Sequence, residues 1–453
     1  MARKKKSDII DYNRQPEIPQ ALAEELPMGK VVEDAYIRFG SYVNTSRHFL
    51  GLKDGLKPSY RRLYYISSTF KKGEWIPNNT LLGSVSRIHP HGVDSLLGVI
   101  SVFAISGVFD FKGSPGHTNL LGQTSEPAAA RYTKSKISDL YLKIMSGTLS
   151  EVNMIPSPNE EKEPEYIPTP VPLGMILNER SLGLGVGIST NVPTFNPKSL
   201  LDAYLNDNPL LLEPRTDIII DKNKSDLKSL WETGQGSIHY KLRLSRVNTP
   251  DNREGILIEG DSLVFTPDWN KRIKKWEAEN KLTIDDCTDM TGPKVLVARI
   301  PGARGITIDD IDKECQRICQ KSIKFTIYAT DGNSTFRIPI KNWIDYTYKN
   351  YISLITQVNQ KRIGQVEFEI AVQEALPIVV EYVMNKNPKA ENNELAKNLN
   401  MPIEIIESVM SKPISHLRKT KDTSERVKAL KNRLNELKKF NPVQHTYDII
   451  QEM

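Results

Sequence analysis

The pattern of hydrophobic and polar positions divides the chain into a helical first part, a strand-rich middle and a helical end. Residues 1–28 are polar with scattered prolines and predict an extended arm. Between residues 29 and 154, short apolar stretches are separated by glycine and proline, which predicts short helices joined by turns. One of them, at residues 59–67, fits a helix whose polar side carries Arg61 and Arg62.

A cluster of prolines marks a domain boundary after this first part. The prolines are Pro156, Pro158, Pro164, Pro168, Pro170 and Pro172. Proline fixes φ and lacks an N–H donor, so we expect an extended segment that crosses between two domains. From about residue 174 to residue 341, short β-branched runs separated by helical stretches predict an α+β domain. The strand candidates are residues 217–220, 255–258, 294–297 and 334–338.

Apolar residues return at helical spacing in the last part of the chain. One set is Ile344, Tyr348, Tyr351, Ile355 and Val358, and a second is Val427, Leu430, Leu434 and Leu437. Alternating steps of three and four are typical of an antiparallel coiled coil, and two amphipathic helices of one globular domain fit equally well. We therefore expect four parts, at residues 1–28, 29–154, 155–341 and 342–453.

Composition restricts the class of protein. The 453 residues contain no run of about eighteen apolar residues, and the chain starts without the apolar stretch of a secretory signal. The three cysteines are too few for a disulfide framework, which favours a reducing compartment such as the cytoplasm. Cys315 and Cys319 lack nearby residues to complete a zinc site, so we expect both in the core and no bound metal.

The net charge of +6 is concentrated in one segment. Residues 29–153 hold 15 Lys and Arg against 9 Asp and Glu, so the excess in this segment equals the net charge of the whole chain. The remainder of the chain is balanced. A local excess of positive charge indicates a face that binds phosphate groups.

The same segment carries four motifs in a specific order. Arg47 comes first, and Lys-Asp-Gly-Leu-Lys-Pro-Ser-Tyr-Arg-Arg follows at residues 53–62. Ile-His-Pro-His-Gly stands at residues 88–92 and Ala-Ala-Ala-Arg-Tyr-Thr at residues 128–133. In this order and spacing the chain resembles the breakage-reunion subunit of type IIA DNA topoisomerases, the A subunit of bacterial gyrase and topoisomerase IV.

The resemblance implies roles for residues at matching positions. Tyr132 matches a nucleophile that forms a 5′-phosphotyrosine bond, and its neighbour Arg131 matches an arginine that stabilises the pentacovalent phosphate. Tyrosine has an ordinary pKa near 10, so such a site must activate the phenol and neutralise the phosphate. Arg47 and His89 match residues that act at the same phosphate, and the positions that match DNA contacts are Lys57, Arg61, Arg62 and His91.

A glycine-rich stretch at residues 183–193 is a further match. Its spacing differs from that of dinucleotide-binding loops, and no strand-helix unit surrounds it, so we do not expect a cofactor there. In the family this stretch carries an apolar wedge that enters the base stack and bends DNA, and Leu184 occupies that position. A turn at residues 232–237 resembles the family's entry into its next strand.

The resemblance also implies a fold, cofactors and partners. It predicts a winged-helix DNA-gate domain, an α+β tower and a long coiled coil that ends in a dimerisation globule. No ATP-binding loop is apparent, and Glu259 with Gly260 lacks the further acidic residues of a Toprim metal site, so we expect a strand end and turn there. Mg²⁺ and ATP would then be bound by a separate ATPase/Toprim subunit, with double-stranded DNA as substrate and two copies of this chain as a homodimer.

Some positions depart from the family pattern. Lys134 stands where the family has an acidic residue, and Tyr60 stands where histidine is usual. The sequence stops at Met453, soon after the second set of apolar residues, as in the medium subunit of T-even phage topoisomerases. We accordingly expect relaxation and decatenation without intrinsic negative supercoiling. Two alternatives stay open at this point, a DNA-nicking tyrosine enzyme and a catalytically inactive protein of the same fold that binds and bends DNA.

Overall fold

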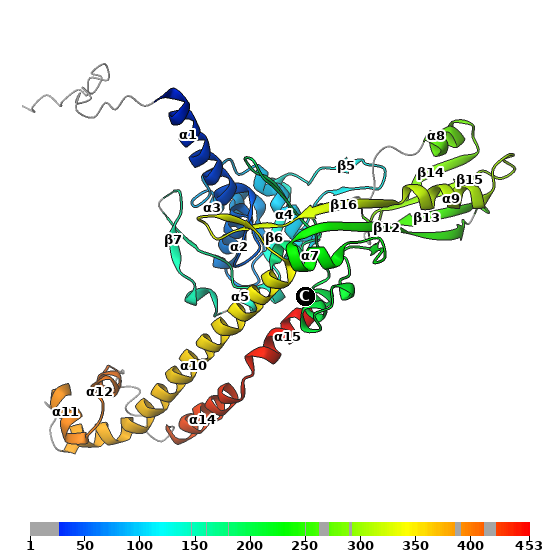
Figure 1. Ribbon diagram of the computed structural model, residues 1–453. Helices are drawn as coiled ribbons and strands as arrows, with labels where there is room; N and C mark the ends of the chain where they lie inside the picture. Colours follow the sequence, from blue (N-terminus) through cyan, green and yellow to red (C-terminus); the bar gives the residue numbers. More distant parts are fainter. Residues whose placement is uncertain are drawn as a thin grey trace, which may run out of the picture.

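The computed structural model describes residues 27–145, 147–159, 161–179, 181–249, 251–261, 271–289, 292–385, 391–411 and 423–453. Most of the predicted arm therefore lies outside the described residues. The described part forms a body made of helices and sheets, from which a stalk of long helices extends (Figure 1). None of the described helices is both long and apolar enough to cross a membrane.

The first part contains short helices, as the alternation of apolar stretches and turns predicts, and a small antiparallel sheet, which that pattern does not predict. The sheet has the order β2-β6-β3, with β2 at Ile76–Pro77, β6 at Lys134–Ile137 and β3 at Phe109–Lys112. Its helices are α1 (Met28–Val43), the π-helix η2 (Asn44–His48), α2 (Pro58–Thr69), α3 (Asn78–Val85), α4 (Ser95–Ile105) and α5 (Asp139–Met145). Short elements complete it, namely β4 (His117–Thr118), β5 (Thr124–Ser125), η3 (Ala130–Tyr132) and η4 (Leu149–Glu151).

The predicted helix at residues 59–67 is α2, and Pro58 occupies its first turn. Proline is favoured there because the first N–H groups of a helix have no intrahelical partner. Leu63, Tyr64 and Ile66 of α2 are buried in the main core. Their rings and methyl groups pack with α4, where Phe103 meets Tyr64 edge to face.

The proline-rich segment leaves the first part as an extended chain. It forms the hairpin of β7 (Met154–Pro156) and β8 (Lys162–Pro164) and then passes through the core to the 3₁₀ turn η5 (Leu173–Met175). Ile167 and Val171 are fully buried on this path. The segment is thus a structural part of the body.

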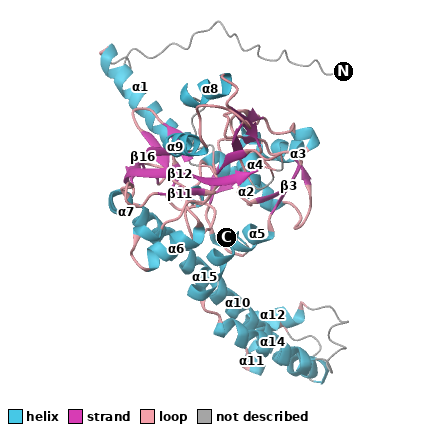
Figure 2. Ribbon diagram, turned by 90° about the vertical axis from the view of Figure 1, so that its right-hand side faces the viewer, coloured by secondary structure: helices cyan, strands magenta, loops and turns pink. Residues whose placement is uncertain are grey.

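The strand-rich middle is built on one eight-stranded sheet with the order β14-β15-β13-β12-β16-β10-β9, in which β11 also pairs with β12 (Figure 2). The four strand candidates are all strands. The sheet comprises β9 (Ser181–Leu184), β10 (Ser189–Val192), β11 (Ile218–Ile220), β12 (Gln235–Asn248), β13 (Glu254–Glu259), β14 (Leu282–Asp286), β15 (Lys294–Arg299) and β16 (Gln320–Thr326). The helices of this part are α6 (Pro197–Leu205), η6 (Pro209–Leu211), α7 (Leu227–Thr233), α8 (Lys271–Ala278) and α9 (Ile308–Ile318).

The two first parts of the chain are joined by a second small sheet. β1 (Leu50–Gly51) pairs in parallel with β17 (Tyr328–Thr330), which pairs with β18 (Thr335–Arg337). Cys315 and Cys319 are buried, as expected for core residues. Gly234 ends α7 with a positive φ and leads into β12, so the turn predicted there is confirmed.

The last part contains the helices α10 (Ile340–Asn385), α11 (Asn392–Leu399), α12 (Ile403–Met410), α14 (Thr423–Lys439) and α15 (Pro442–Glu452). α10 and α14 lie side by side in opposite directions, because Lys431 pairs with Glu374 while Lys438 pairs with Glu367. The far end of α10 packs with α11 and α12 around a small core of its own.

The two apolar seams do not pair with each other. Ile344, Tyr348, Tyr351 and Ile355 join the core of the body, and the seam of α14 packs on Val366 and Ile370 further along α10. The base of α10 is fastened to the body by hydrogen bonds. The Trp343 indole Nε1 donates to the Leu52 carbonyl at 2.8 Å, and the Tyr351 hydroxyl donates to the Ile144 carbonyl at 3.0 Å.

Candidate active site

Tyr132 projects from a single 3₁₀ turn at the edge of the first domain. Its side chain is 72% exposed, and the Arg131 guanidinium lies 4.8 Å from the ring centroid. The backbone N–H of Tyr132 donates to the Ala129 carbonyl at 2.9 Å, which closes the turn. An exposed phenol beside a guanidinium is free to meet a substrate from solvent.

The residue after Tyr132 holds this turn in place. Thr133 is buried, its Oγ1 accepts a hydrogen bond from the Asn78 amide at 2.7 Å, and its carbonyl accepts one from the Asn78 N–H at 3.0 Å. On the other side Gly113 has φ +119°, and a Cβ there would lie 2.6 Å from Thr133 Cγ2. Thr133, next to Tyr132, is therefore held by the first residue of α3 on one side and enclosed by the turn after β3 on the other.

Arg47 and the two histidines form a second cluster. The Arg47 Nε and Nη2 atoms lie 2.9 Å from the two ring nitrogens of His91. A neutral imidazole accepts a hydrogen bond at one ring nitrogen only, so one of these contacts is the hydrogen bond. The rings of His89 and His91 meet edge to face, with centroids 5.4 Å apart.

His89 lies behind His91 in this cluster. It is 5% exposed, and its Nδ1 has no hydrogen-bond partner among the described residues. Burial lowers the pKa of His89 to about 4, with Arg62, His91 and Arg47 acting in the same direction. Burial and the neighbouring Arg47 also lower the pKa of His91. His89 is therefore neutral at pH 7.

The four predicted catalytic residues fall into two groups. Arg47 and His89 share one cluster through His91, and Tyr132 pairs with Arg131. Among the described residues no hydrogen bond or ring contact joins Tyr132 to the histidine cluster. Within one chain the site consists of two separate groups.

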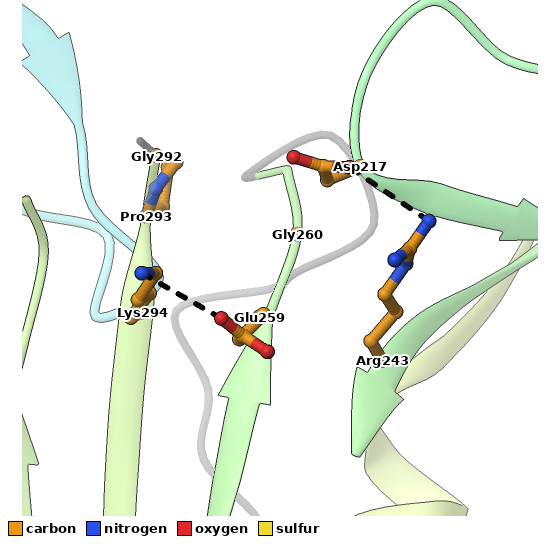
Figure 3. Close-up of a pocket in the computed structure, with 7 residues that line it drawn as sticks. All are labelled: Asp217, Arg243, Glu259, Gly260, Gly292, Pro293 and Lys294. Atoms are coloured by element: carbon orange, nitrogen blue, oxygen red, sulfur yellow. Dashed lines mark ion pairs between the residues drawn. The ribbon is translucent and has the colours of Figure 1, made fainter. Parts of the chain in front are cut away.

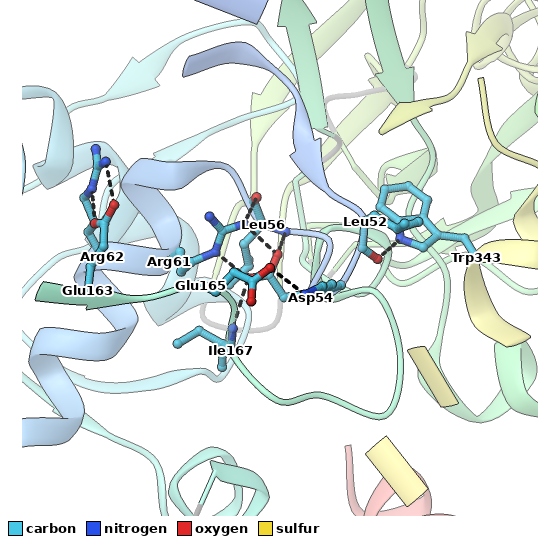
Figure 4. Close-up of polar contacts among 10 residues, drawn as sticks. Leu52, Asp54, Leu56, Arg61, Arg62, Glu163, Glu165, Ile167 and Trp343 are labelled. Carbon is cyan, nitrogen blue, oxygen red and sulfur yellow. Dashed lines mark hydrogen bonds and ion pairs between the residues drawn. The ribbon is translucent and has the colours of Figure 1, made fainter. Parts of the chain in front are cut away.

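Arg61 is held by a buried carboxylate. Its Nε and Nη2 donate to the two oxygens of Asp54 at 2.6 and 3.0 Å (Figure 4). Asp54 is fully buried and also accepts the N–H groups of Leu56 and Ile167. Two of the guanidinium nitrogens of Arg61 are therefore used inside the protein, and contact of Arg61 with DNA stays a prediction.

Arg62 is held in the same way by Glu163 of β8. The Nε and Nη2 atoms donate to the two carboxylate oxygens at 2.5 and 2.9 Å, and the two residues are 7% and 8% exposed (Figure 4). The sequence pattern places Arg62 on a solvent-facing side, and the structure places it in a buried ion pair. The physical reason is that a bidentate carboxylate satisfies the guanidinium inside the protein.

Gly55 explains why the turn of this motif needs glycine. It has φ +69°, and a Cβ there would lie 2.9 Å from the Leu173 nitrogen. The Leu173 and Gly174 N–H groups donate to the carbonyls of Asp54 and Gly55, both at 2.9 Å. Asp54 and Gly55 of the Asp-Gly-Leu-Lys-Pro motif thus hold the chain at residues 167–174.

Leu184 lies at the end of β9 and is 67% exposed. β9 and β10 form an antiparallel hairpin, so this described stretch is not the strand-helix unit of a cofactor loop. The Asn44 amide donates to the Val186 carbonyl at 3.1 Å and accepts the Val186 N–H at 2.7 Å, which ties the hairpin to η2. The Lys57 ammonium donates to the Leu182 carbonyl at 2.7 Å, and burial lowers the pKa of Lys57.

Glu259 is a strand end followed by a turn, as predicted. It closes β13, and its carboxylate lies 3.6 Å from the Lys294 ammonium beside a cavity of about 90 Å³ (Figure 3). Arg243 and Asp217 line the other side of this cavity. Within the described ranges no group of three His, Cys, Asp or Glu side chains could hold a metal ion.

Sequence reasoning missed the residues that support the site. Asp54 and Glu163 fix the two arginines, Asn78 fixes the tyrosine turn, and Asn44 fixes the hairpin. Asp54 stands inside a quoted motif and is a plausible partner for Arg61, seven residues away. The other three meet partners more than fifty residues away, for which the sequence gives no local signal.

Comparison with known proteins identifies the family. The model of the family described as the A subunit of DNA gyrase/topoisomerase IV matches residues 51–453, which include Tyr132 and the histidine pair. The chain belongs to this family. The part of the A-subunit fold described above is therefore an α+β assembly with an exposed tyrosine in its first domain.

Several relatives are similar over part of their length. The gyrase A subunit of Clostridium acetobutylicum is 31% identical over 243 residues, 49% of this chain and 29% of that protein. The topoisomerase 4 A subunit of Haemophilus influenzae is 28% identical over 241 residues, 48% and 32%. The gyrase A subunit of Brachyspira hyodysenteriae is 23% identical over 397 residues, 81% and 47%. The alignments thus span less than half of each relative.

Proposed function

We propose that the chain is the DNA-cleaving and rejoining subunit of a type IIA topoisomerase and that Tyr132 is its nucleophile. One observation carries the proposal: in a chain of the A-subunit family, the tyrosine at the matching position is 72% exposed on a backbone fixed from two sides. Structural tyrosines of the same domain, such as Tyr64 and Tyr141, are buried.

The reaction is a reversible exchange of phosphate esters. The Tyr132 oxygen attacks a DNA phosphorus atom, a new P–O bond forms, and the bond to the 3′ oxygen of the preceding nucleotide breaks. The phenol gives up its proton, and the departing 3′ oxygen takes one up. The phosphotyrosine ester preserves the energy of the broken bond, so the same 3′ oxygen can attack it and restore the strand.

Arg131 and the histidine cluster supply the electrostatic part of this chemistry. Arg131, stacked on the Tyr132 ring, stabilises the charge that develops on the phosphate oxygens. Arg47 and the partly exposed His91 belong to the second group, and they contact the phosphate of the DNA. His89, being buried and neutral at pH 7, positions the His91 ring from behind.

The remaining expectations stay predictions. They are a homodimer, double-stranded DNA as substrate, a separate ATPase/Toprim subunit that binds Mg²⁺ and ATP, and relaxation and decatenation without intrinsic negative supercoiling. The winged-helix domain and the apolar wedge at Leu184 belong to the same set of predictions.

The test is Tyr132→Phe in the presence of a B-type subunit, Mg²⁺ and ATP. Covalent DNA adducts, trapped with denaturant and counted on a gel, should disappear, while binding to a labelled duplex should remain. Tyr36→Phe is the matched control, because Tyr36 is also an exposed tyrosine, at 63%. Adducts at the original level in Tyr132→Phe would refute the assignment. Binding and bending without adducts in the unmodified protein would favour the inactive alternative.

A further inference from the structure

The outer face of the small sheet carries three lysines around one tryptophan. The burial pattern alternates along β6, so that Ser135 and Ile137 point inward while Lys134 and Lys136 point outward. In the register of the sheet, Lys112 stands opposite Lys134 and Asp110 opposite Lys136. We call Trp75, Lys112, Lys134 and Lys136 the lysine platform.

The platform holds positive charges close together. The Lys112 and Lys136 ammonium groups lie 4.2 and 5.4 Å from the centroid of the same Trp75 ring. A cation–π contact attracts an ammonium group to the face of the ring. The two ammonium groups on this ring repel each other, and an anion beside them would lower this repulsion.

Among the described residues, one carboxylate forms an ion pair with the platform. Asp110 lies 2.8 Å from the Lys136 ammonium, whereas Lys112 and Lys134 form no ion pair within the part of the chain that the structure describes. The platform therefore keeps an excess of positive charge toward solvent.

The platform has a fixed position relative to the tyrosine. Lys134 follows Tyr132 by two residues, and the two hydrogen bonds from Asn78 described above hold Thr133 between them. A DNA strand that presents a phosphorus atom to Tyr132 brings neighbouring phosphates to the same edge of the sheet. Successive phosphates on one strand are spaced by about 3.4 Å along the helix axis.

We propose that the lysine platform binds the DNA phosphodiester backbone next to the cleaved phosphate, with Trp75 holding two of the three ammonium groups in place. The inference rests on the proposed function, since it takes the duplex at Tyr132 as its ligand. It adds a binding surface outside the tyrosine and histidine groups.

The test is the salt dependence of duplex binding by the full chain, in a Tyr132→Phe background that prevents cleavage. The slope of log affinity against log salt is negative, and each lost phosphate contact lowers its magnitude by about 0.9. Replacing Lys112, Lys134 and Lys136 by Gln should lower it by about 2.7. Trp75→Leu should lower the magnitude of the slope by a smaller amount. Lys112 and Lys136 lose their cation–π contacts in this variant, whereas Lys134 makes none with Trp75.

The matched control replaces three exposed lysines far from the sheet, Lys228, Lys397 and Lys428, by Gln, with the same change in net charge. If the magnitude of the slope falls equally in both triple variants, or in neither, the lysine platform does not bind the DNA backbone, and the proposed function is unaffected. A starting protein that does not bind duplex DNA at all would instead overturn the proposed function. The double variant Lys112→Glu with Lys134→Glu reverses two charges of the platform. The magnitude of its salt slope should fall further than that of Lys112→Gln with Lys134→Gln.

Discussion

Arg62 and Glu163 form a buried ion pair, and breaking this pair tests whether Arg62 joins α2 to β8. Arg62→Met removes one partner and leaves a carboxylate that is 8% exposed without its cation. Breaking a buried pair in this way costs about 3–5 kcal/mol, whereas replacing both partners by apolar residues is nearly neutral. Arg62→Met should therefore strongly destabilise the contact between α2 and β8, and Arg62→Met with Glu163→Leu should restore most of the loss.

The assay is amide hydrogen exchange measured on peptides of α2 and β8, because a protein with several structural parts does not unfold in one step. A cost of about 3 kcal/mol or more corresponds to exchange more than about a hundredfold faster in these peptides, since about 1.36 kcal/mol is a factor of ten. Peptides of α14, far along the stalk, serve as the internal reference. Unchanged exchange in Arg62→Met, together with a lower salt slope of DNA binding, would refute the structural role and support DNA contact by Arg62.

Two further predictions concern His89 and Leu184. The folded-state pKa of His89 lies below its unfolded value, so the unfolded chain binds more protons between pH 4 and 6.5, and stability should rise with pH across this window by at most about 3 kcal/mol. His89→Gln should flatten this rise in the free energy of local opening, measured by amide hydrogen exchange of peptides that contain residues 88–92. An equally steep pH profile in the variant would contradict the assignment. Leu184→Ala removes an exposed apolar side chain, and DNA bending measured by end-to-end fluorescence transfer should fall while the melting temperature stays unchanged. An unaltered bend would show that Leu184 does not enter the base stack.

The features that the sequence predicts correctly depend on short-range pattern. The helix α2 and the strands β11, β13, β15 and β18 follow from periodicity, and the turn after α7 follows from the family resemblance. Tyr132 is singled out by the order and spacing of four separate motifs, and its role as nucleophile stays a prediction. These features are set by neighbours along the chain, and their physical cause is visible in a short window.

Whether an individual side chain is buried or paired is harder to predict from the sequence, because this depends on partners far along the chain. Arg62 meets a carboxylate 101 residues away, and a hydropathy pattern counts arginine as polar whether or not it is paired. The two apolar seams suggest a shared interface, although any buried surface can satisfy an apolar stripe. The seam at the start of α10 is satisfied by the body and leaves only the later part of that helix for α14.

The way in which the stalk is attached to the body has a mechanical consequence. α10 has 46 residues, which corresponds to a length of about 69 Å, and it runs from the body along the stalk (Figure 1). Trp343 and Tyr351 in its first part donate hydrogen bonds to the carbonyls of Leu52 and Ile144. The returning helix α15 is bonded to the same body, where Arg215 donates to the Met453 carbonyl at 3.1 Å. The stalk is therefore a lever with two fixed points at one end. Over that length, a rotation of the tyrosine-bearing body by about 5° displaces the far end of α10 by about 6 Å.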